Sequence, residues 1–397
     1  MIFPALESGI QVSNEKNPIA AWRDPRLART ILSQIRRLAV EAGRPLRFME
    51  VCGTHTMSAA RAGLHDLLPN SVRLSSGPGC PVCVTSPGFI AAAVDLSRDR
   101  RITIATFGDL VRVPGAAAPA HRVSLERARA SGADIRVVYS ALDALALARR
   151  DASREIVFLG VGFETTAPTV AAAVRRAAME GITNFSVLPA HKTMPRALRA
   201  ILDSGDVRID GLLCPGHVSV ITGSLVYGFI AREFGVPCAI AGFEPVDMLV
   251  GIRSLLEQHV AGRAEVVNSY GRVVRDEGNF RARNLMDEIF EPEDAEWRGF
   301  GVIPESGLGF RREHHHRDAV RRFRIVVPRI MPPPSCRCGE ILRGAEEPDQ
   351  CAHFGRDCIP ARPVGPCMVS NEGACAAAFR YRRAPLSIGS LVSEATA

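Results

Sequence analysis

Six of the eleven cysteines lie in one segment near the carboxyl end of the chain. The segment is rich in glycine and proline and poor in apolar residues, so we expect a metal or a covalent link to organise it. A cubane iron–sulfur cluster needs four thiolates, which would leave two cysteines over. Four thiolates also form structural zinc sites, and spacing alone selects no set of four. The six are Cys336, Cys338, Cys351, Cys358, Cys367 and Cys375. Because the paired C-x2-C spacing of zinc ribbons is missing, the spacing favours a cluster over zinc.

A second candidate site begins at Cys52, in the run Cys-Gly-Thr-His. Cys52 follows an apolar stretch and precedes a helix expected over residues 56–67. The amino end of a helix lowers the pKa of a cysteine and favours the thiolate, which is the form that binds metals and attacks electrophiles. His55 lies close enough in sequence to donate a hydrogen bond at this site. The alternative is a buried, inert thiol.

Cys80 and Cys83 form a C-x2-C pair directly after Gly77-Pro-Gly79. The glycines permit a tight turn and a close approach of the backbone. Two thiols at this spacing can form a redox-active disulfide or supply half of a metal site.

Two further candidates are less specific. Glu164 follows an apolar run and could act as an acid or base in a cleft, or cap the helix expected to begin near Thr169. His314-His-His316 could bind nickel or zinc, although a solvated basic loop is the favoured interpretation of the triplet.

These residues share a position relative to the expected elements. Short apolar runs are each followed by a polar or reactive residue, a glycine or proline turn, and a helical segment. The runs are mostly continuous, as in strands buried on both faces. Open α/β sheets bind ligands beyond the carboxyl ends of their strands, so we expect a functional cleft there. The runs cover residues 47–51, 71–74, 102–107, 156–161, 185–188, 211–214 and 238–241.

The predicted fold class is therefore α/β, with two doubly wound parallel-sheet domains and a small loop-rich iron–sulfur domain. We place the first α/β domain, with Cys52 and the C-x2-C pair, at residues 1–145. The second α/β domain is expected at 146–260. The cysteine-rich domain is expected at 261–397.

Composition narrows the classes of function. The chain has 397 residues and a net charge of +7, carried almost wholly by arginine, since Lys16 and Lys192 are the only lysines. Arginine pairs with carboxylates and could bind an acidic partner, but arginines scattered over a solvated surface are the favoured explanation of the charge. No basic tail or aromatic–basic pattern indicates nucleic-acid binding. The first residues do not resemble a secretory signal, and the longest apolar stretch, near 218–231, is too short for a membrane span. We expect a cytoplasmic protein whose thiols stay reduced.

The motifs together resemble the HypD family of nickel–iron hydrogenase maturation factors. The resemblance covers residues 49–375 in the family's order, and it departs from the family pattern only at Cys214 and at the histidine triplet. The motifs that carry it are Met49-Glu-Val-Cys-Gly-Thr-His-Thr56, Gly77-Pro-Gly-Cys-Pro-Val-Cys-Val-Thr85, Phe107-Gly-Asp-Leu-Val-Arg-Val-Pro-Gly115, Gly162-Phe-Glu-Thr-Thr-Ala-Pro168, Pro215-Gly-His-Val-Ser219, Gly242-Phe-Glu-Pro-Val-Asp247, Trp297-Arg-Gly-Phe-Gly301, Cys336-Arg-Cys-Gly-Glu340, Gly365-Pro-Cys-Met-Val-Ser370 and Glu372-Gly-Ala-Cys375.

The resemblance implies an assembly role. HypD-like proteins pair with the small protein HypC and hold an iron atom while cyanide and carbon monoxide are added, which gives an Fe(CN)2CO centre. HypE hands over the cyanide. By the family pattern Cys52 is the thiolate that holds the iron, and Cys80 and Cys83 are a nearby redox pair or auxiliary ligands.

The family pattern also sorts the six C-terminal cysteines. Four match [4Fe-4S] ligands, namely Cys336, Cys351, Cys358 and Cys375. Cys338 and Cys367 match an extra pair, a disulfide near the cluster. We hypothesise that electrons run from the cluster through this pair to Cys80 and Cys83, and then to the iron on Cys52. Such a protein is a redox-active assembly scaffold rather than a conventional turnover enzyme. The alternatives are a stand-alone iron–sulfur thiol–disulfide oxidoreductase and a zinc-dependent binding protein.

Overall fold

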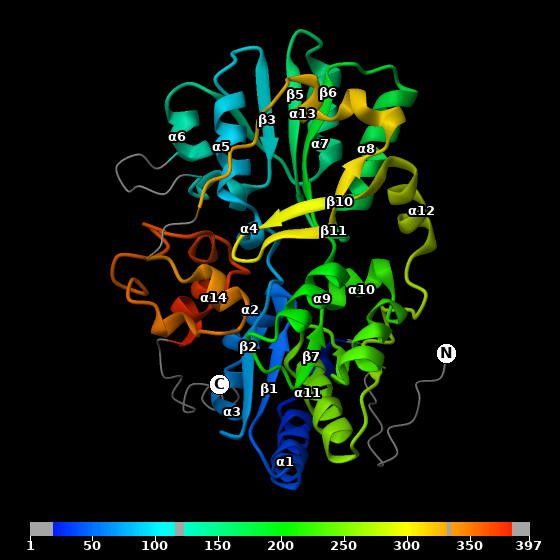
Figure 1. Cartoon of the computed structure of the whole chain (residues 1–397), viewed down its shortest axis with the longest axis vertical. Coiled ribbons are helices and arrows are strands. Elements are labelled where there is room, and N and C mark those ends of the chain that lie inside the picture. Colours follow the sequence, from blue (N-terminus) through cyan, green and yellow to red (C-terminus); the bar gives the residue numbers. More distant parts are fainter. Residues whose placement is uncertain (1–18, 116–122, 332–334, 383–397) are drawn as a thin grey trace, which may run out of the picture.

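The computed structural model describes residues 19–115, 123–331 and 335–382. Two parallel sheets lie one above the other, and the cysteine-rich segment lies beside them (Figure 1). The lower sheet has the strand order β2-β1-β7-β8-β9 and the upper sheet has the order β4-β3-β5-β6. The lower strands are β1 (Leu46–Glu50), β2 (Val72–Ser76), β7 (Gly211–Cys214), β8 (Cys238–Ile240) and β9 (Val266–Asn268). The upper strands are β3 (Ile102–Thr106), β4 (Asp134–Val137), β5 (Glu155–Gly162) and β6 (Phe185–His191).

Helices cover both sheets. α1 and α11 pack against each other on the lower sheet, and α7 and α8 pack together on the upper sheet. The longer helices are α1 (Pro25–Glu41), α2 (Gly53–Arg61), α5 (Pro87–Leu96), α7 (Ala141–Arg150), α8 (Ala167–Met179), α9 (Met194–Ser204), α10 (Gly216–Thr222), α11 (Pro245–Val260) and α12 (Phe280–Ile289). The shorter helices are α3 (Leu64–Leu67), α4 (Pro81–Val84), α6 (Leu125–Ala130), α13 (Ala319–Arg322), α14 (Cys338–Leu342) and α15 (Ala374–Ala377).

The predicted α/β class with two parallel sheets and a loop-rich cysteine segment is confirmed, and each of the seven predicted strands is present. The two sheets are nevertheless built from interleaved parts of the chain. Strand β1 pairs with β7, so the lower sheet combines residues before and after the whole upper sheet. The boundary expected at 145 and 146 falls within α7, between β4 and β5 of one sheet.

The helix predicted over residues 56–67 is two helices. α2 ends at Arg61 and α3 begins at Leu64, with Gly63 between them at a φ of 65°. That left-handed conformation suits glycine and interrupts the helical hydrogen bonding.

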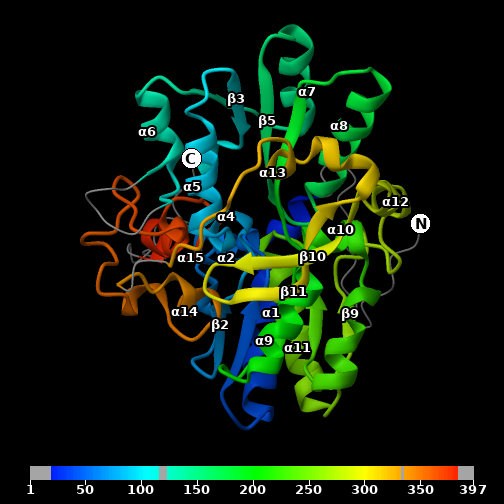
Figure 2. The ribbon, with the colours of Figure 1, turned by 45° about the horizontal axis from the view of Figure 1, so that its top comes forward.

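An antiparallel hairpin crosses the middle of the molecule between the two sheets (Figures 1 and 2). It consists of β10 (Phe290–Trp297) and β11 (Gly301–Phe310), and its existence was not predicted. Trp297 is fully buried and donates from Nε1 to Ser306 Oγ at 2.8 Å. At one side the hairpin joins the loop after β6, where Thr193 N donates to Ser306 O at 2.8 Å. At the other side it joins the segment after α4, where Thr85 and Trp297 form an isolated antiparallel β-bridge.

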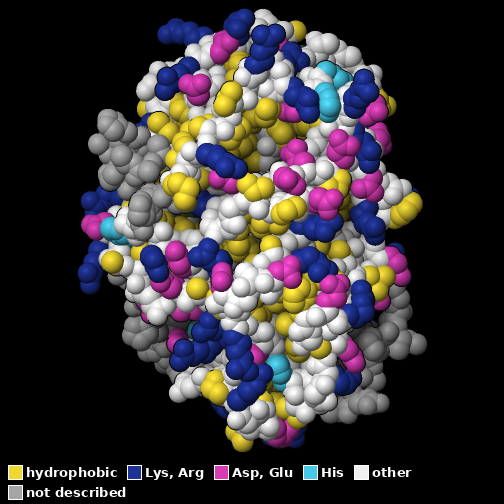
Figure 3. Space-filling view, viewed as in Figure 1, with side chains coloured by type: hydrophobic (Ala, Val, Ile, Leu, Met, Phe, Trp, Pro, Cys, Tyr) yellow, Lys and Arg dark blue, Asp and Glu magenta, His cyan; other side chains and the backbone are white. Residues whose placement is uncertain are grey.

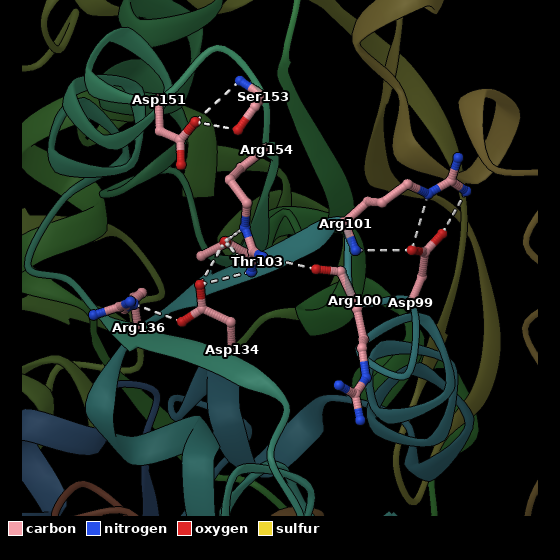
Figure 4. Close-up of polar contacts among 9 residues, drawn as sticks. All are labelled: Asp99, Arg100, Arg101, Thr103, Asp134, Arg136, Asp151, Ser153 and Arg154. Carbon is pink, nitrogen blue, oxygen red and sulfur yellow. Dashed lines mark hydrogen bonds and ion pairs between the residues drawn. The ribbon is translucent and has the colours of Figure 1, made fainter.

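A polar network closes the edge of the upper sheet at which its strands begin (Figure 4). The Arg154 guanidinium donates to Thr103 Oγ1 and, at 2.9 Å, to Asp134 Oδ2. Asp134 also accepts from Thr103 at 2.8 Å and from Arg136 at 2.6 Å. Burial opposes ionisation of Asp134, but these donors and the two arginines hold its pKa below the ordinary value. The network therefore ties together β3, β4 and the start of β5.

Basic and acidic side chains are interspersed over the face shown in Figure 3. This distribution agrees with the interpretation that the arginines are spread over the surface. Within the described ranges, no helix is both long enough and apolar enough to cross a membrane.

Candidate metal centre and thiol site

Cys52 lies between the end of β1 and the first turn of α2. Its side chain is buried, and its backbone packs directly on Gly79: a Cβ atom at Gly79 would lie 2.4 Å from Cys52 Cα. Gly53 N donates to Gly79 O at 3.0 Å. The glycine before the C-x2-C pair is therefore needed for the approach of the two cysteine segments, as the sequence indicated.

The predicted net lowering of the Cys52 pKa is wrong, although the amino end of α2 acts in the predicted direction. Burial raises the pKa of the thiol to about 12, and the negative charge of Glu372 raises it further. Hydrogen bonds from Thr54 and His55 act in the opposite direction and are outweighed. A free thiolate at Cys52 is thus disfavoured, and a bound cation would be needed to stabilise it.

Glu372 links the Cys52 site to the cysteine-rich segment. Thr54 Oγ1 donates to Glu372 Oε1 at 2.6 Å, and a Cβ atom at Gly53 would lie 2.6 Å from Glu372 Cβ. Glu372 precedes Cys375 by three residues, and α15, which carries Cys375, packs against α2. The sequence reasoning gave Glu372 no role, although it lies within one of the family motifs.

His55 is fully buried but does not point at the Cys52 sulfur. Its Nε2 lies 3.1 Å and 3.0 Å from the carbonyl oxygens of Ala241 and Gly242, so this nitrogen carries the proton and donates. Its ring contacts Phe243 at a centroid distance of 4.8 Å. Burial lowers the pKa of His55 to about 4, so the ring is neutral at pH 7. The described hydrogen bonds leave Nδ1 without a partner.

Cys80 and Cys83 form a disulfide, and both residues are buried. We call this bond the α4 disulfide, because Cys80 caps α4 and Cys83 lies within it. Helix α4 packs directly against the short 3-10 helix Pro366–Met368, which carries Cys367. No domain movement is needed to bring the two cysteine segments into contact.

Five of the six C-terminal thiols line a single cavity, together with Ile341, Phe354 and Met368. The polypeptide fits closely around them: a Cβ atom at Gly365 would lie 2.6 Å from the sulfurs of both Cys336 and Cys338. The Cys358 sulfur accepts from Val364 N at 3.3 Å. The lining cysteines are Cys336, Cys338, Cys351, Cys358 and Cys375.

This cavity suits a cubane cluster. A cubane binds its four thiolates through four different iron atoms, so the ligands must surround a space rather than converge on one point. In the described residues, no group of three or more Cys, His, Asp or Glu side chains converges so as to hold one ion, and this includes His314, His315 and His316. Bound there, a [4Fe-4S] cluster would supply one-electron redox chemistry.

Cys338 and Cys367, which we call the extra pair, are in side-chain contact as free thiols, so the disulfide expected between them is not formed in this structure. Cys338 also contacts Cys336 and lines the cavity, whereas Cys367 is fully buried behind it. The geometry therefore places the extra pair between the cavity and α4. Since five thiols line the cavity, the choice of four ligands stays a prediction.

The described interactions of Glu164 do not involve the thiols of the site. Its Oε1 accepts from Met194 N at 2.9 Å, so it caps α9 rather than the predicted helix near Thr169. Burial raises the pKa of Glu164 to about 7, and the described residues offer its Oε2 no hydrogen bond. The interactions found for Glu164 connect it to α9 and to Tyr227, which gives no support to a role at the thiol site.

Comparison with known proteins shows the family to which the chain is similar. The family model HypD, described as the Hydrogenase formation hypA family, matches residues 26–382. The chain belongs to the HypD family. It is 46% identical over 369 residues to hydrogenase maturation factor HypD2 of Bradyrhizobium diazoefficiens, covering 91% of this chain and 96% of the relative. It is 42% identical over 367 residues to hydrogenase maturation factor HypD of Escherichia coli, covering 91% of this chain and 97% of the relative. The expected family is therefore confirmed, and with it a role in hydrogenase maturation.

Proposed function

We propose that this HypD-family chain holds the iron atom of a nickel–iron hydrogenase during its assembly, with Cys52 as the protein thiolate. The iron and its two cyanide ligands and one carbon monoxide ligand are the cargo. A HypC-like partner supplies a second thiolate, and a HypE-like partner supplies cyanide. Soft thiolate donors suit low-spin iron that carries cyanide and carbonyl ligands.

One observation carries the proposal: the three sets of cysteines meet at one junction. The Cys52 backbone packs on Gly79, α4 packs on the 3-10 helix with Cys367, and α2 packs on α15 with Cys375. These contacts connect segments that are far apart in the sequence. A cluster and two dithiol pairs beside a metal-binding thiol suit a reaction that needs both a metal anchor and electrons.

The same contacts support the proposed order of electron transfer. The cavity thiols, the extra pair and the α4 disulfide follow one another in space, and Cys52 lies next to the α4 segment. The cluster would deliver single electrons, and a dithiol pair would store two for reductive transfer of cyanide.

The stand-alone oxidoreductase is less well supported. Such an enzyme must expose one sulfur to the disulfide of another protein, because exchange proceeds through a mixed disulfide. Cys80 is 2% exposed and Cys83 is fully buried.

The decisive experiment is an infrared spectrum of the chain purified anaerobically with its HypC-like partner, beside a Cys52→Ala variant. The proposal expects cyanide and carbonyl stretching bands in the first sample and their loss in the second. The core cysteine variant Cys214→Ala is the matched control and should keep the bands. Bands that persist without Cys52 would remove it as the anchor.

The electron route has its own test. Replacing either member of the extra pair, as Cys338→Ser or Cys367→Ser, should leave the iron and sulfide content of the chain unchanged and abolish hydrogenase maturation. Cys214→Ala is again the control. Full hydrogenase activity with either serine variant would exclude the extra pair from the route.

A further inference from the structure

An open groove lies at the edge of the upper sheet at which its strands begin. Its volume is about 950 Å³, which falls in the range of small-molecule binding sites. Four parts of the chain contribute to it: the loop between α5 and β3, helix α6, strand β4, and the loop between α7 and β5. Among the described residues that line the groove there is no cysteine, so it is separate from the thiol site. Its arginines are Arg98, Arg100, Arg127, Arg136 and Arg154.

The groove carries more positive charge than its own carboxylates can balance. Five arginines and two aspartates line it, which leaves a net charge of +3. Figure 4 shows Asp134 between Arg136 and Arg154, and its carboxylate accepts from Arg136 Nε at 2.6 Å and from Arg154 Nη2 at 2.9 Å. One carboxylate therefore serves two guanidinium groups. The second aspartate, Asp151, accepts from Ser153 N and Oγ.

Arg100 contributes an uncompensated charge. Its carbonyl oxygen accepts from Arg154 Nη1 at 2.7 Å, but in the part of the chain that the structure describes its guanidinium makes no ion pair. Arg98 lies 3.6 Å from Asp95, yet the two side chains are 74% and 78% exposed, so this ion pair contributes little. Like charges gathered in one groove repel one another, and a network that only joined the strands would not need the surplus. An anion in the groove would offset it.

The groove also has an apolar part to its lining. Val94, Ala128 and Ala133 line it together with the arginines. Guanidinium groups bind phosphate and carboxylate groups alike through paired hydrogen bonds. A ligand that has both an uncharged part and closely spaced anionic groups therefore matches this combination of side chains.

We infer that this groove binds a small molecule that carries at least two negative charges on phosphate or carboxylate groups. The site goes beyond the proposed function, because it lies where strands begin, whereas Cys52 follows the end of a strand. The bound anion bridges Arg100 and Arg136, and so joins the loop before β3 to β4. Since a ligand that binds only the folded state stabilises it, the anion also stabilises the upper sheet.

The test is isothermal titration calorimetry of the full chain, purified anaerobically, with pyrophosphate and separately with citrate. We expect one binding site per chain and an affinity that falls as the KCl concentration rises. The double variant Arg100→Gln/Arg136→Gln should weaken binding by about tenfold or more, as expected for the loss of hydrogen bonds to a charged group. The control Arg29→Gln/Arg36→Gln removes the same charge at exposed positions of α1 and should stay within about twofold of the wild type.

The two probes distinguish the sources of the anionic groups. Binding of pyrophosphate alone would assign the groove to phosphate groups, and binding of citrate alone would assign it to carboxylates. Binding of both would assign it to closely spaced anions in general. If neither probe shows saturable binding at millimolar concentration, the inference is wrong. Equal losses of affinity in the groove variant and in the α1 control would also overturn it, because only the net charge would then matter.

Circular dichroism shows whether the variants are folded. If loss of the pair between Arg136 and Asp134 unfolds the chain, Arg100→Glu replaces the double variant, because the Arg100 side chain makes no ion pair with the described residues. This charge reversal should likewise weaken binding by about tenfold or more. An unchanged affinity in a folded variant of either kind would overturn the inference. The infrared bands expected from iron on Cys52 do not depend on this groove, so that result leaves the proposed function intact.

Discussion

At the scale of single residues, burial decides the protonation of the site. Cys52 lies at the amino end of a helix, yet desolvation raises the pKa of its thiol to about 12. The same physical cause lowers the pKa of His55 to about 4. Both groups are therefore neutral in the free chain at pH 7. A thiol of this kind acts as a metal ligand only when an arriving cation replaces its proton.

Removing the charge of Glu372 should make Cys52 more reactive. Glu372 raises the pKa of the Cys52 thiol, so Glu372→Gln should lower that pKa and increase the thiolate fraction at pH 8. We expect the iodoacetamide alkylation rate of Cys52 to rise several-fold, up to about tenfold for a shift of one pKa unit. Peptide mass spectrometry of chain purified without its partner measures this rate. Glu346→Gln is the control, because the Glu346 carboxylate is paired with Arg337 and should not affect the pKa of Cys52. A rate that does not change in Glu372→Gln would refute the electrostatic explanation.

A buried histidine should make stability depend on pH. His191 is 1% exposed, the described residues give neither ring nitrogen a hydrogen bond, and burial lowers its pKa from 6.5 to about 3. The unfolded chain thus binds a proton between pH 6.5 and 3 that the folded chain does not. The free energy of unfolding must fall as the pH falls through this window, by up to about 1.4 kcal/mol per pH unit.

The variant His191→Phe should lose this slope, as measured by urea unfolding at several pH values between 5 and 8. Glu50 and Glu164 have pKa values raised to about 7, so their contributions run in the opposite direction in this range. The difference between the pH slopes of variant and wild type gives the contribution of His191 to the free energy of unfolding. His314→Phe, at a partly exposed position, is the control and should keep the wild-type slope. Parallel curves for His191→Phe and wild type would disprove the assignment.

At the scale of elements, the hairpin holds the junction together. It is bonded to the loop after β6 through Ser306 and to the segment after α4 through Arg298, and its tip packs on α14 through Gly299. Its strands escaped prediction because β10 reads Phe-Glu-Pro-Glu-Asp-Ala-Glu-Trp and has none of the apolar alternation of a half-buried strand. Only its ends, Phe290 and Trp297, are buried.

Two glycines at the hairpin tip allow a matched comparison. Gly299 has a φ of 87° and lies against Gly339, whereas Gly301 has a φ of 75° and no atom within 4 Å of an added Cβ. Gly301→Ala should cost only the left-handed backbone penalty, about 1–2 kcal/mol. Gly299→Ala should cost about 1–3 kcal/mol more, because the added methyl group must displace α14. Urea unfolding measures both. Equal losses of stability would mean that the tip does not press on α14.

The strands were predictable to very different degrees. Continuous apolar runs such as residues 156–161 identify strands buried on both faces, and those strands are present. β4 and β9 are short and largely solvent-exposed or half-buried, so their local pattern is weak. Pairing partners were not predictable, because parallel strands are joined by contacts between distant segments that leave no local signal.

At the scale of the whole molecule, spacing revealed each set of cysteines but not their meeting point. Cys80-Pro-Val-Cys83 and the C-terminal six are visible as local patterns. Their contact depends on how α4, the hairpin and the 3-10 helix Pro366–Met368 are packed. Arg298 and Glu372 lie within the sequence motifs, but only the structure shows that Arg298 donates to Thr85 and that Glu372 accepts from Thr54.

Loss of the proposed cluster should loosen one part of the molecule selectively. Residues 336–375 add side chains such as Leu342 and Met368 to a core shared with the sheets, but have no separate apolar core, whereas the sheets also have cores that this segment does not enter. Removing iron with a chelator under oxidising conditions should therefore accelerate amide hydrogen exchange across residues 336–375 and leave β1, β5 and β6 protected. Mass spectrometry of peptic fragments measures this. Uniform loss of protection would mean that the sheets depend on the metal.

The interleaved sheets set the order in which a newly made chain can be completed. The upper sheet uses residues 102–191 and can close while synthesis continues. Strand β1 emerges from the ribosome earlier, but it cannot pair with β7 until β7 has been made. The hydrogen bond from Arg47 N to Asp210 Oδ2 likewise spans 163 positions. Since Cys52 and Gly53 follow β1, the segment that we propose binds iron leaves the ribosome early and reaches its final setting late. Glu372, which lies against Gly53, is translated later than Asp210. The nascent protein is therefore unable to present a finished Cys52 site until Glu372 has been translated.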